Sequence, residues 1–287
     1  MKELLFLEPI VKELIWGKEC WSVCAHPNGD GIVTDGVYAG KKLSWLWENK
    51  RELFGNLEGD KFPLLVKKIT AKDDLSIQVH PDNAYAKINE NGSLGKTECW
   101  YVTDCKPGGT VIIGHHAASR EEAEELIQNH EWKKFLREIP IKAGDFFQIE
   151  PGIIHAIKRD TEIIEIQQSS DITYRLYDYD RLKDGKPREL HIKKSMDVMQ
   201  IPYKEAEKHK SKPEGCLVSC DYYTVNKREI AGEADFIQDK AFQIVSVIKG
   251  TGMADGKKIE KDDSFIVPFG YGTYKLSGNM NVLISNP

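Results

Sequence analysis

The sequence predicts a mainly β protein built from two related β-barrels with a few α-helices, and only the first barrel is expected to hold a metal. Three observations lead to this fold class. Short runs of alternating apolar and polar residues, separated by Gly- and Pro-bearing turns, recur through much of the chain. Residues 144–155 resemble residues 262–273. Candidate metal ligands lie on expected strands in the first half and have no counterpart in the second.

Composition limits the classes of partner. The chain has 287 residues, enough for one large domain or two ordinary ones, with 40% hydrophobic and 30% charged residues. A formal net charge of −5 gives no general electrostatic reason to bind nucleic acid or an anionic membrane. The first residues, MKELLFLEPIVKELIWGKE, do not form a signal-peptide core, and no run approaches the roughly 20 apolar residues of a membrane span. We expect a cytoplasmic protein with neither kind of partner.

The six cysteines are sparse for this length, which is unlike a disulfide scaffold. The pairs Cys20/Cys24 and Cys216/Cys220 have a Cys-x3-Cys spacing, but no knuckle glycines accompany them. A structural zinc site built from them is therefore disfavoured. We expect reduced, mostly buried thiols.

The first elements lead toward the candidate site. Residues 21–33 read as strand, turn and strand around the turn at 27–31. Residues 41–55 form the first clear helical pattern, with Gly55 as its C-terminal stop. Residues 62–71 then read as a strand.

Three possible metal ligands follow on two expected strands, 75–80 and 97–102, joined by a polar, turn-forming stretch at 81–93. Residues two apart on a strand point the same way, so Gln78, His80 and Glu98 can share one face of an antiparallel pair. An imidazole, a carboxylate and an amide oxygen suit a borderline metal such as zinc. A further imidazole is needed to complete the set.

The next elements supply that imidazole. Residues 108–116 read as a strand that ends in His115-His116, which we expect to be exposed turn residues. A helix is predicted for 119–139 from its Ser-x-x-Glu capping box. Residues 144–157 read as strand, tight turn and strand, with His155 just past the corner. A strand at 162–168, a short helix at 188–199 and a polar linker at 201–216 follow in order.

The last part of the chain reads as short strands at 217–230, 241–250, 263–276 and 281–287. Within it, residues 262–273 repeat the turn, strand and glycine of 144–155. The repeat aligns Thr273 with His155 and predicts an inward-pointing side chain at both positions. The second half lacks the His-x-His and Glu of the first, so it is expected to have no metal.

Several motifs, in this order, resemble one known family. QVHPDNAYA, GKTECWYV, EPGIIHAI and SSDITYRLYDYDR…RELHI resemble the short bacterial form of type I mannose-6-phosphate isomerase, in the cupin superfamily. The resemblance implies two cupin-type, jelly-roll-like β-barrels. It implies a metal-binding catalytic domain with helical insertions at 1–200 and a cupin-like β domain without metal ligands at 201–287. It further implies one Zn²⁺ per chain, with the ligands Gln78, His80, Glu98 and His155.

The resemblance also implies an activity, the interconversion of mannose 6-phosphate and fructose 6-phosphate through a metal-stabilised enediol. It assigns the catalytic arginine to Arg175 and active-site positions to Lys96 and Glu165. Arg175 could polarise a substrate oxygen or hold the phosphate. Lys96 could bind phosphate or relay a proton, and Glu165 is a candidate carboxylate for proton transfer. The identity of the base stays open.

Arg175 and the whole protein each have alternative interpretations. A structural salt bridge of Arg175 to Asp171, Asp178 or Asp180 is the alternative to a catalytic role. For the whole protein, the alternatives are a non-catalytic cupin that senses sugar phosphates and an iron-dependent cupin oxygenase. Such oxygenases often use several histidine ligands, whereas this set is mixed.

Overall fold

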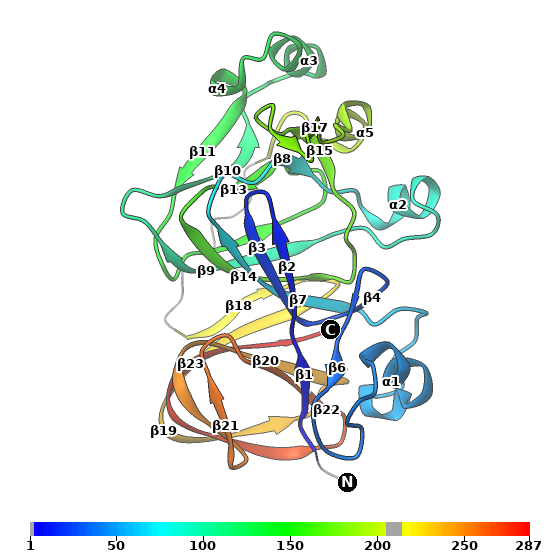
Figure 1. Cartoon of the computed structure of the whole chain (residues 1–287), viewed down its shortest axis with the longest axis vertical. Coiled ribbons are helices and arrows are strands. Elements are labelled where there is room, and N and C mark those ends of the chain that lie inside the picture. Colours follow the sequence, from blue (N-terminus) through cyan, green and yellow to red (C-terminus); the bar gives the residue numbers. More distant parts are fainter. Residues whose placement is uncertain (1–2, 205–213) are drawn as a thin grey trace.

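The computed structural model describes residues 3–204 and 214–287, and within these ranges the fold is mainly β, as predicted (Figure 1). Most strands in the described residues belong to three sheets, which we call the site sheet, the imidazole sheet and the C-terminal sheet. The first two occupy the upper half of Figure 1 and the third occupies the lower half. None of the helices in these ranges is long and apolar enough to cross a membrane.

The site sheet and the imidazole sheet face each other. The site sheet runs in the order β12 (Phe146–Ile149), β9 (Glu98–Cys105), β14 (Thr161–Gln168), β7 (Leu64–Ala71), β3 (Gly17–Val23) and β2 (Ile10–Leu14). The imidazole sheet runs in the order β11 (Leu136–Pro140), β10 (Thr110–His115), β13 (His155–Ile157), β8 (Ile77–Val79) and β15 (Tyr174–Tyr177). Trp100 and Val102 of the first sheet share an apolar cluster with Ile113 and Ile157 of the second.

The C-terminal sheet contains strands from both ends of the chain. Its order is β18 (Gly215–Ser219), β19 (Thr224–Gln238), β23 (Gly272–Asn286), β20 (Phe242–Ala254), β22 (Ser264–Pro268), β1 (Leu5–Glu8) and β6 (Ile32–Val33), with β21 (Lys257–Glu260) on β20. The N-terminal β1 therefore pairs with β22, far along the chain. The division at residue 200 stays a prediction, and this pairing shows that the first strand belongs to the later sheet.

Helices cover the sheets at their edges and outer faces. They are α1 (Leu43–Asn49), the 3₁₀ helix η1 (Arg51–Phe54), α2 (Asn83–Asn89), α3 (Arg120–Gln128), α4 (Trp132–Phe135) and α5 (Ile192–Val198). The predicted stop at Gly55 is confirmed, because this residue adopts a left-handed conformation at the end of η1. The predicted cap of α3 is confirmed too, since the Glu122 N–H donates to Ser119 Oγ at 3.2 Å. Two small hairpins, β4 (Ala25–His26) with β5 (Gly29–Asp30) and β16 (Leu182–Lys183) with β17 (Lys186–Pro187), complete the described elements.

The outer face of the site sheet packs on the C-terminal sheet. Val66 and Ile164 of the site sheet lie in one buried cluster with Phe242 and Leu283 of the C-terminal sheet. Because successive residues of a strand face opposite ways, the site sheet is buried on both faces. The inner face of the site sheet, which is turned away from the C-terminal sheet, carries the buried polar side chains of the candidate site.

The structure corrects several local predictions. The expected turn at 81–93 contains α2, which is capped by the Asp82 carboxylate. The expected helix at 119–139 ends at Gln128 and the chain later turns into β11. The C-terminal strands are not all short, because β19 and β23 each have 15 residues. Within the predicted linker, residues 205–213 lie outside the described ranges.

Three predictions about side-chain burial are wrong. Thr273 is exposed, and the buried side chain is that of Tyr274, because the proline of the second hairpin comes one residue earlier and shifts the alternation of faces. His115 is buried, with its ring stacked on Phe135 at 5.1 Å. All six cysteines are free, but of these only Cys24 and Cys99 are buried.

Candidate active site

Two buried imidazoles of the imidazole sheet lie next to each other. His80 directly follows β8 and His155 begins β13, and these two strands are paired. The Nδ1 atoms lie 2.7 Å from the Ile172 carbonyl and 2.8 Å from the Ile153 carbonyl, so we assign the ring proton of each histidine to Nδ1. The two Nε2 atoms, 3.1 Å apart, are then both acceptors. Burial, the largest cause, lowers the pKa of both histidines, which keeps the rings neutral.

Glu98, the first residue of β9, reaches the imidazoles from the site sheet. Its Oε2 lies 3.5 Å from His80 Nε2 and its Oε1 lies 3.6 Å from His155 Nε2. Burial alone would raise the pKa of Glu98, but the charges of Lys96 and Lys67 and the hydrogen bond from Lys96 outweigh it and lower the pKa. Two neutral imidazoles and one ionised carboxylate, with ligand atoms within 4.8 Å of one another, are a donor set that fits a divalent metal such as zinc.

Gln78 lies beside these three residues. It is the cross-strand partner of His155 in the pair formed by β13 and β8, and directly opposite residues of a sheet share a face. It also lines the pocket in front of the site. Its position is therefore consistent with the predicted fourth ligand.

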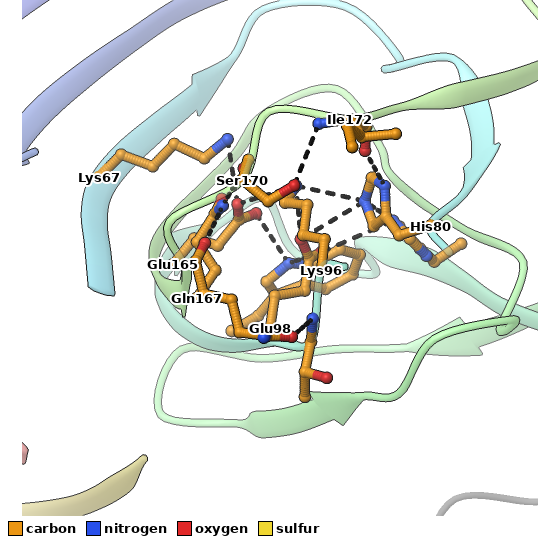
Figure 2. A network of polar contacts seen from close by, with 12 residues as sticks. Lys67, His80, Lys96, Glu98, Glu165, Gln167, Ser170 and Ile172 are labelled. Atoms are coloured by element: carbon orange, nitrogen blue, oxygen red, sulfur yellow. Dashed lines mark hydrogen bonds and ion pairs between the residues drawn. The ribbon is translucent and has the colours of Figure 1, made fainter. Parts of the chain in front are cut away.

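Starting from Glu98, buried ion pairs connect a row of side chains of alternating charge (Figure 2). Lys96 Nζ lies 2.7 Å from Glu98 Oε2 and 3.5 Å from Glu165 Oε1, and it donates to His80 Nε2 at 3.2 Å. On its other side, Glu165 Oε1 lies 3.0 Å from Lys67 Nζ. Burial opposes the charge of Lys67, but Glu165 and Glu19 outweigh it and raise its pKa, so this lysine remains cationic.

Trp100 also contacts both carboxylates. Its indole Nε1 donates to Glu98 Oε1 at 2.9 Å and to Glu165 Oε2 at 3.0 Å. The ring lies edge-on to His155, with centroids 5.4 Å apart.

A pocket of about 340 Å³ opens in front of this cluster. Its described lining contains more cationic than acidic side chains: Lys12, Lys67, Lys96, Arg175 and Arg188 against Glu19, Glu165 and Asp171. Such a lining suits a small anionic ligand. Lys96 lines the pocket and also contacts His80 and Glu98, so it joins the pocket to the cluster of His80, Glu98 and His155.

Arg175 lies in the pocket wall, on β15, opposite Gln78. Its Nη1 donates to the Glu189 carbonyl at 2.8 Å, while its buried Nε has no hydrogen-bond partner among the described residues. Burial, then the neighbouring Arg188, lowers the pKa of Arg175.

Two of the three acidic residues named as alternative partners of Arg175 pair with other residues. Asp178 binds Arg181 and Arg188, and Asp171 accepts from Asn28. Within residues 3–204 and 214–287 Arg175 makes no ion pair, so the structural salt bridge is not observed.

Sequence reasoning missed two residues of the cluster, Lys67 and Trp100. Lys67 stands in the apolar strand LLVKKITA, where a buried lysine requires a buried acid, and this was the available signal. Trp100 stands two residues after Glu98 and so shares its face of β9. Neither partner could be identified without the pairing of β14 with β7 and β9.

Comparisons with known proteins agree with this arrangement. The family model "Phosphomannose isomerase type I, catalytic domain" matches residues 7–103, and "Mannose-6-phosphate isomerase, cupin domain" matches residues 214–287. The chain is 44% identical over 312 residues to mannose-6-phosphate isomerase ManA of Bacillus subtilis, covering 99% of each chain. It belongs to the type I phosphomannose isomerase family.

Other members of the family extend the likeness. Mannose-6-phosphate isomerase of Streptococcus mutans is 40% identical, covering 100% of this chain and 99% of that protein. A crystal structure of a mannose 6-phosphate isomerase from Bacillus subtilis matches with a TM-score of 0.95 at 40% identity, with 100% of both chains covered. The apo form from Salmonella typhimurium has a TM-score of 0.75 at 14% identity, with 99% of both covered, and supports the fold alone. The predicted cupin fold is confirmed.

Proposed function

We propose that this chain is a metal-dependent aldose–ketose isomerase that interconverts mannose 6-phosphate and fructose 6-phosphate. The proposal rests on the 44% sequence identity to a mannose-6-phosphate isomerase over 99% of both chains, together with a buried His, Glu, His cluster at the end of a cationic pocket. No comparable observation favours a sugar-phosphate sensor or an iron oxygenase.

The metal is proposed to be one Zn²⁺, held by His80, Glu98 and His155 with Gln78 as the fourth ligand. Two imidazole nitrogens and oxygen donors match the preference of zinc, and the carbonyl contacts of Nδ1 make each Nε2 the unprotonated nitrogen, as coordination requires. When bound, a divalent metal supplies Lewis-acid stabilisation of negative charge on substrate oxygens.

Isomerisation moves one proton between C2 and C1 of the sugar and one between O2 and O1. We assign the transfer of the proton between the two carbons to Glu165, because a carboxylate that lines the pocket can accept this proton from one carbon and return it to the other. Lys96, which lines the same pocket, is assigned to donate a hydrogen bond or proton at the oxygens. Lys67 holds Glu165 in place through its ion pair.

Arg175 is proposed to hold a substrate oxygen. Its buried Nε lacks a partner among the described residues, and a guanidinium offers donors in a fixed fork that matches phosphate or vicinal oxygens. The hydrogen bond from Nη1 to the Glu189 carbonyl fixes one end of the guanidinium in the pocket wall.

We propose that residues 1–200 provide the catalytic domain and residues 201–287 a cupin-like β domain without a metal. A cytoplasmic location fits the expected substrates, which are small phosphorylated sugars.

A coupled assay that starts from mannose 6-phosphate tests the activity. Turnover should be present in the metal-loaded protein, fall after treatment with a chelator and return when Zn²⁺ is added. A metal-loaded sample without turnover would disprove the assignment. Restoration by Fe²⁺ but not by Zn²⁺ would contradict the proposed metal.

A further inference from the structure

Glu98 and Glu165 are joined by two different bridges. Lys96 Nζ contacts Glu98 Oε2 and Glu165 Oε1, at 2.7 and 3.5 Å. Trp100 Nε1 donates to the other oxygen of each, Glu98 Oε1 and Glu165 Oε2, at 2.9 and 3.0 Å. The four residues thus close a ring in which two buried carboxylates, which repel each other, are held by two donors.

The two donors differ in their freedom to move. Lys96 precedes β9, lines the pocket and carries its ammonium on a flexible four-carbon chain, so it can turn to a substrate oxygen. Trp100 lies within β9, is 1% exposed and carries an indole N–H that acts only as a hydrogen-bond donor. It remains in place when Lys96 changes partners.

The sheet fixes this second bridge. Trp100 is the cross-strand partner of Glu165 in the pair of β9 and β14, and it stands two residues from Glu98 on the same face. Its ring also packs edge-on against His155. One side chain therefore contacts two candidate metal ligands and the candidate proton-transfer group.

We propose that Trp100 is a positioning residue, whose single indole N–H keeps the metal-ligating carboxylate of Glu98 and the proton-transferring carboxylate of Glu165 in a fixed relation. The part that concerns Glu165 rests on the proposed isomerase function. The part that concerns Glu98 requires only that the cluster binds a divalent metal.

The variant Trp100→Phe retains an aromatic ring and removes the N–H. Its dissociation constant for Co²⁺, measured by competition with a coloured chelator, should rise about tenfold, as expected when a hydrogen bond to a ligand is lost. In the same variant kcat for mannose 6-phosphate should fall at least about tenfold while KM stays within about threefold, because the lost contact orients catalytic groups and not substrate.

A double-mutant cycle with Glu165→Gln separates positioning from a general loss of activity. If Trp100 acts through Glu165, adding Trp100→Phe to Glu165→Gln should lower kcat by less than about threefold. Fully additive losses would overturn this part of the proposal.

Trp47→Phe is the matched control. Trp47 is also buried, at 2% exposure, and its N–H has no partner among the described residues, in the cluster beneath α1. This variant should lower the melting temperature yet change the Co²⁺ affinity and kcat by less than about twofold. An equal loss in both variants would overturn the proposal, as would unchanged Co²⁺ affinity and kcat in Trp100→Phe.

If Trp100→Phe does not fold by circular dichroism, Trp100→Tyr is used for the same measurements. If the unmodified protein does not turn over mannose 6-phosphate, the proposed function fails. In that case the Co²⁺ affinity alone decides whether Trp100 holds Glu98.

Discussion

At the scale of single residues, the backbone prepares the two histidines for their role. Each Nδ1 is bound to a carbonyl, of Ile172 or of Ile153, and each Nε2 points to the shared centre. The orientation of the rings therefore does not depend on another titrating side chain.

His155→Ala should abolish stoichiometric zinc binding, because it removes one of two imidazoles from a small donor set. Metal content of the purified protein, measured by mass spectrometry, checks this. Gln78→Ala should retain zinc with an affinity about 10–100-fold weaker if the amide is a ligand. Normal zinc stoichiometry in His155→Ala would remove this histidine from the site.

Arg175→Ala should lower kcat at least about 100-fold, as when a donor to developing charge is removed, while the zinc content stays intact. Steady-state kinetics and metal analysis on the same sample provide the test. Arg159→Ala, at an exposed arginine beside Asp160, is the control and should behave as the unmodified protein. Loss of zinc together with activity in Arg175→Ala would point to a structural role instead.

Strand periodicity was sufficient to predict part of this site. The spacing of two residues placed Gln78 and His80 on one face, and the turn before His155 suggested the missing imidazole. The partners of Glu165 were beyond such reasoning, since Lys67 and Trp100 meet it only through the pairing of three strands.

At the scale of elements, the turn between β12 and β13 holds the site together. Gly152 has a φ of +85°, its N–H donates to the His80 carbonyl at 2.9 Å, and its carbonyl accepts from Gln200 N–H at 2.9 Å. A Cβ added at this glycine would lie 2.6 Å from the Val198 carbonyl oxygen. The turn thus links the backbone of His80 to the segment that leads into His155 on β13.

Gly152→Ala should lower the free energy of unfolding by roughly 1–3 kcal/mol and weaken Co²⁺ binding, since both backbone strain and the clash displace the turn. Urea unfolding and chelator competition measure the two effects. Gly108→Ala is the control, because Gly108 also has a positive φ, of +72°, but its Cβ would meet nothing within 4 Å. If Gly108→Ala weakened Co²⁺ binding equally, the contact with Val198 would not be the cause.

The short hairpin of β16 and β17 depends on a buried carboxylate. Asp178 binds Arg181 at 2.6 Å and Arg188 at 2.5 Å, from the two sides of the hairpin. Burial alone would raise the pKa of Asp178, but Arg188 and Arg181 outweigh it and lower the pKa. Arg188 is thereby held in the pocket wall.

Asp178→Asn should cost about 3 kcal/mol of the free energy of unfolding near pH 7, because two arginines lose their counterion. The folded-state pKa is below the ordinary value of about 3.9, so this contribution is complete above that pH and is lost as the pH falls through the lowered pKa. Unfolding curves of both proteins from pH 7 downward should therefore converge in acid. A difference that grew on acidification would contradict this assignment.

Element boundaries show where sequence patterns fail. The stretch at 81–93 is rich in turn formers, yet the Asp82 cap starts α2. Strand β23 reads as two strands because Gly278 and Asn279 interrupt the pattern. A glycine is needed at position 278, within the strand, because a Cβ added there would lie 2.6 Å from the Cα of Gly252 on β20.

At the scale of the whole molecule, one apolar cluster connects the site sheet to the C-terminal sheet. Phe242 of β20 packs against Phe54 and Phe62, with ring centroids 5.6 and 5.0 Å apart. The sheets that form the candidate metal site therefore pack on a sheet that supplies none of its proposed ligands.

Phe242→Ala should lower the free energy of unfolding by about 3–5 kcal/mol, as for other buried aromatic residues, and unfolding should remain a single transition. Far-UV circular dichroism and release of bound Co²⁺ should report the same midpoint. Phe236→Ala, at a partly buried ring on the far side of the C-terminal sheet, should cost less. Separate midpoints for the two probes would show that the sheets unfold independently.

The internal repeat predicted two related halves, and the backbone agrees, since φ is positive at Gly144 and Asp262 and again at Gly152 and Gly270. No sequence pattern indicated that β1 crosses to the C-terminal sheet. Such a pairing depends on the fit of two whole surfaces and not on local preference.

The pairing of β1 with β22 has a consequence for biosynthesis. Leu5 and Phe6 pair with Ile266 and Phe265, so one edge of β1 has no strand partner until some 260 further residues have been made, while its other edge pairs with the nearby β6 through Leu7 and Val33. At rates of synthesis of about 5–20 residues per second, this wait is on the order of ten seconds to a minute. During it one edge of β1 carries unpaired backbone N–H and C=O groups, and an unpaired strand edge of this kind is a template for pairing with another chain.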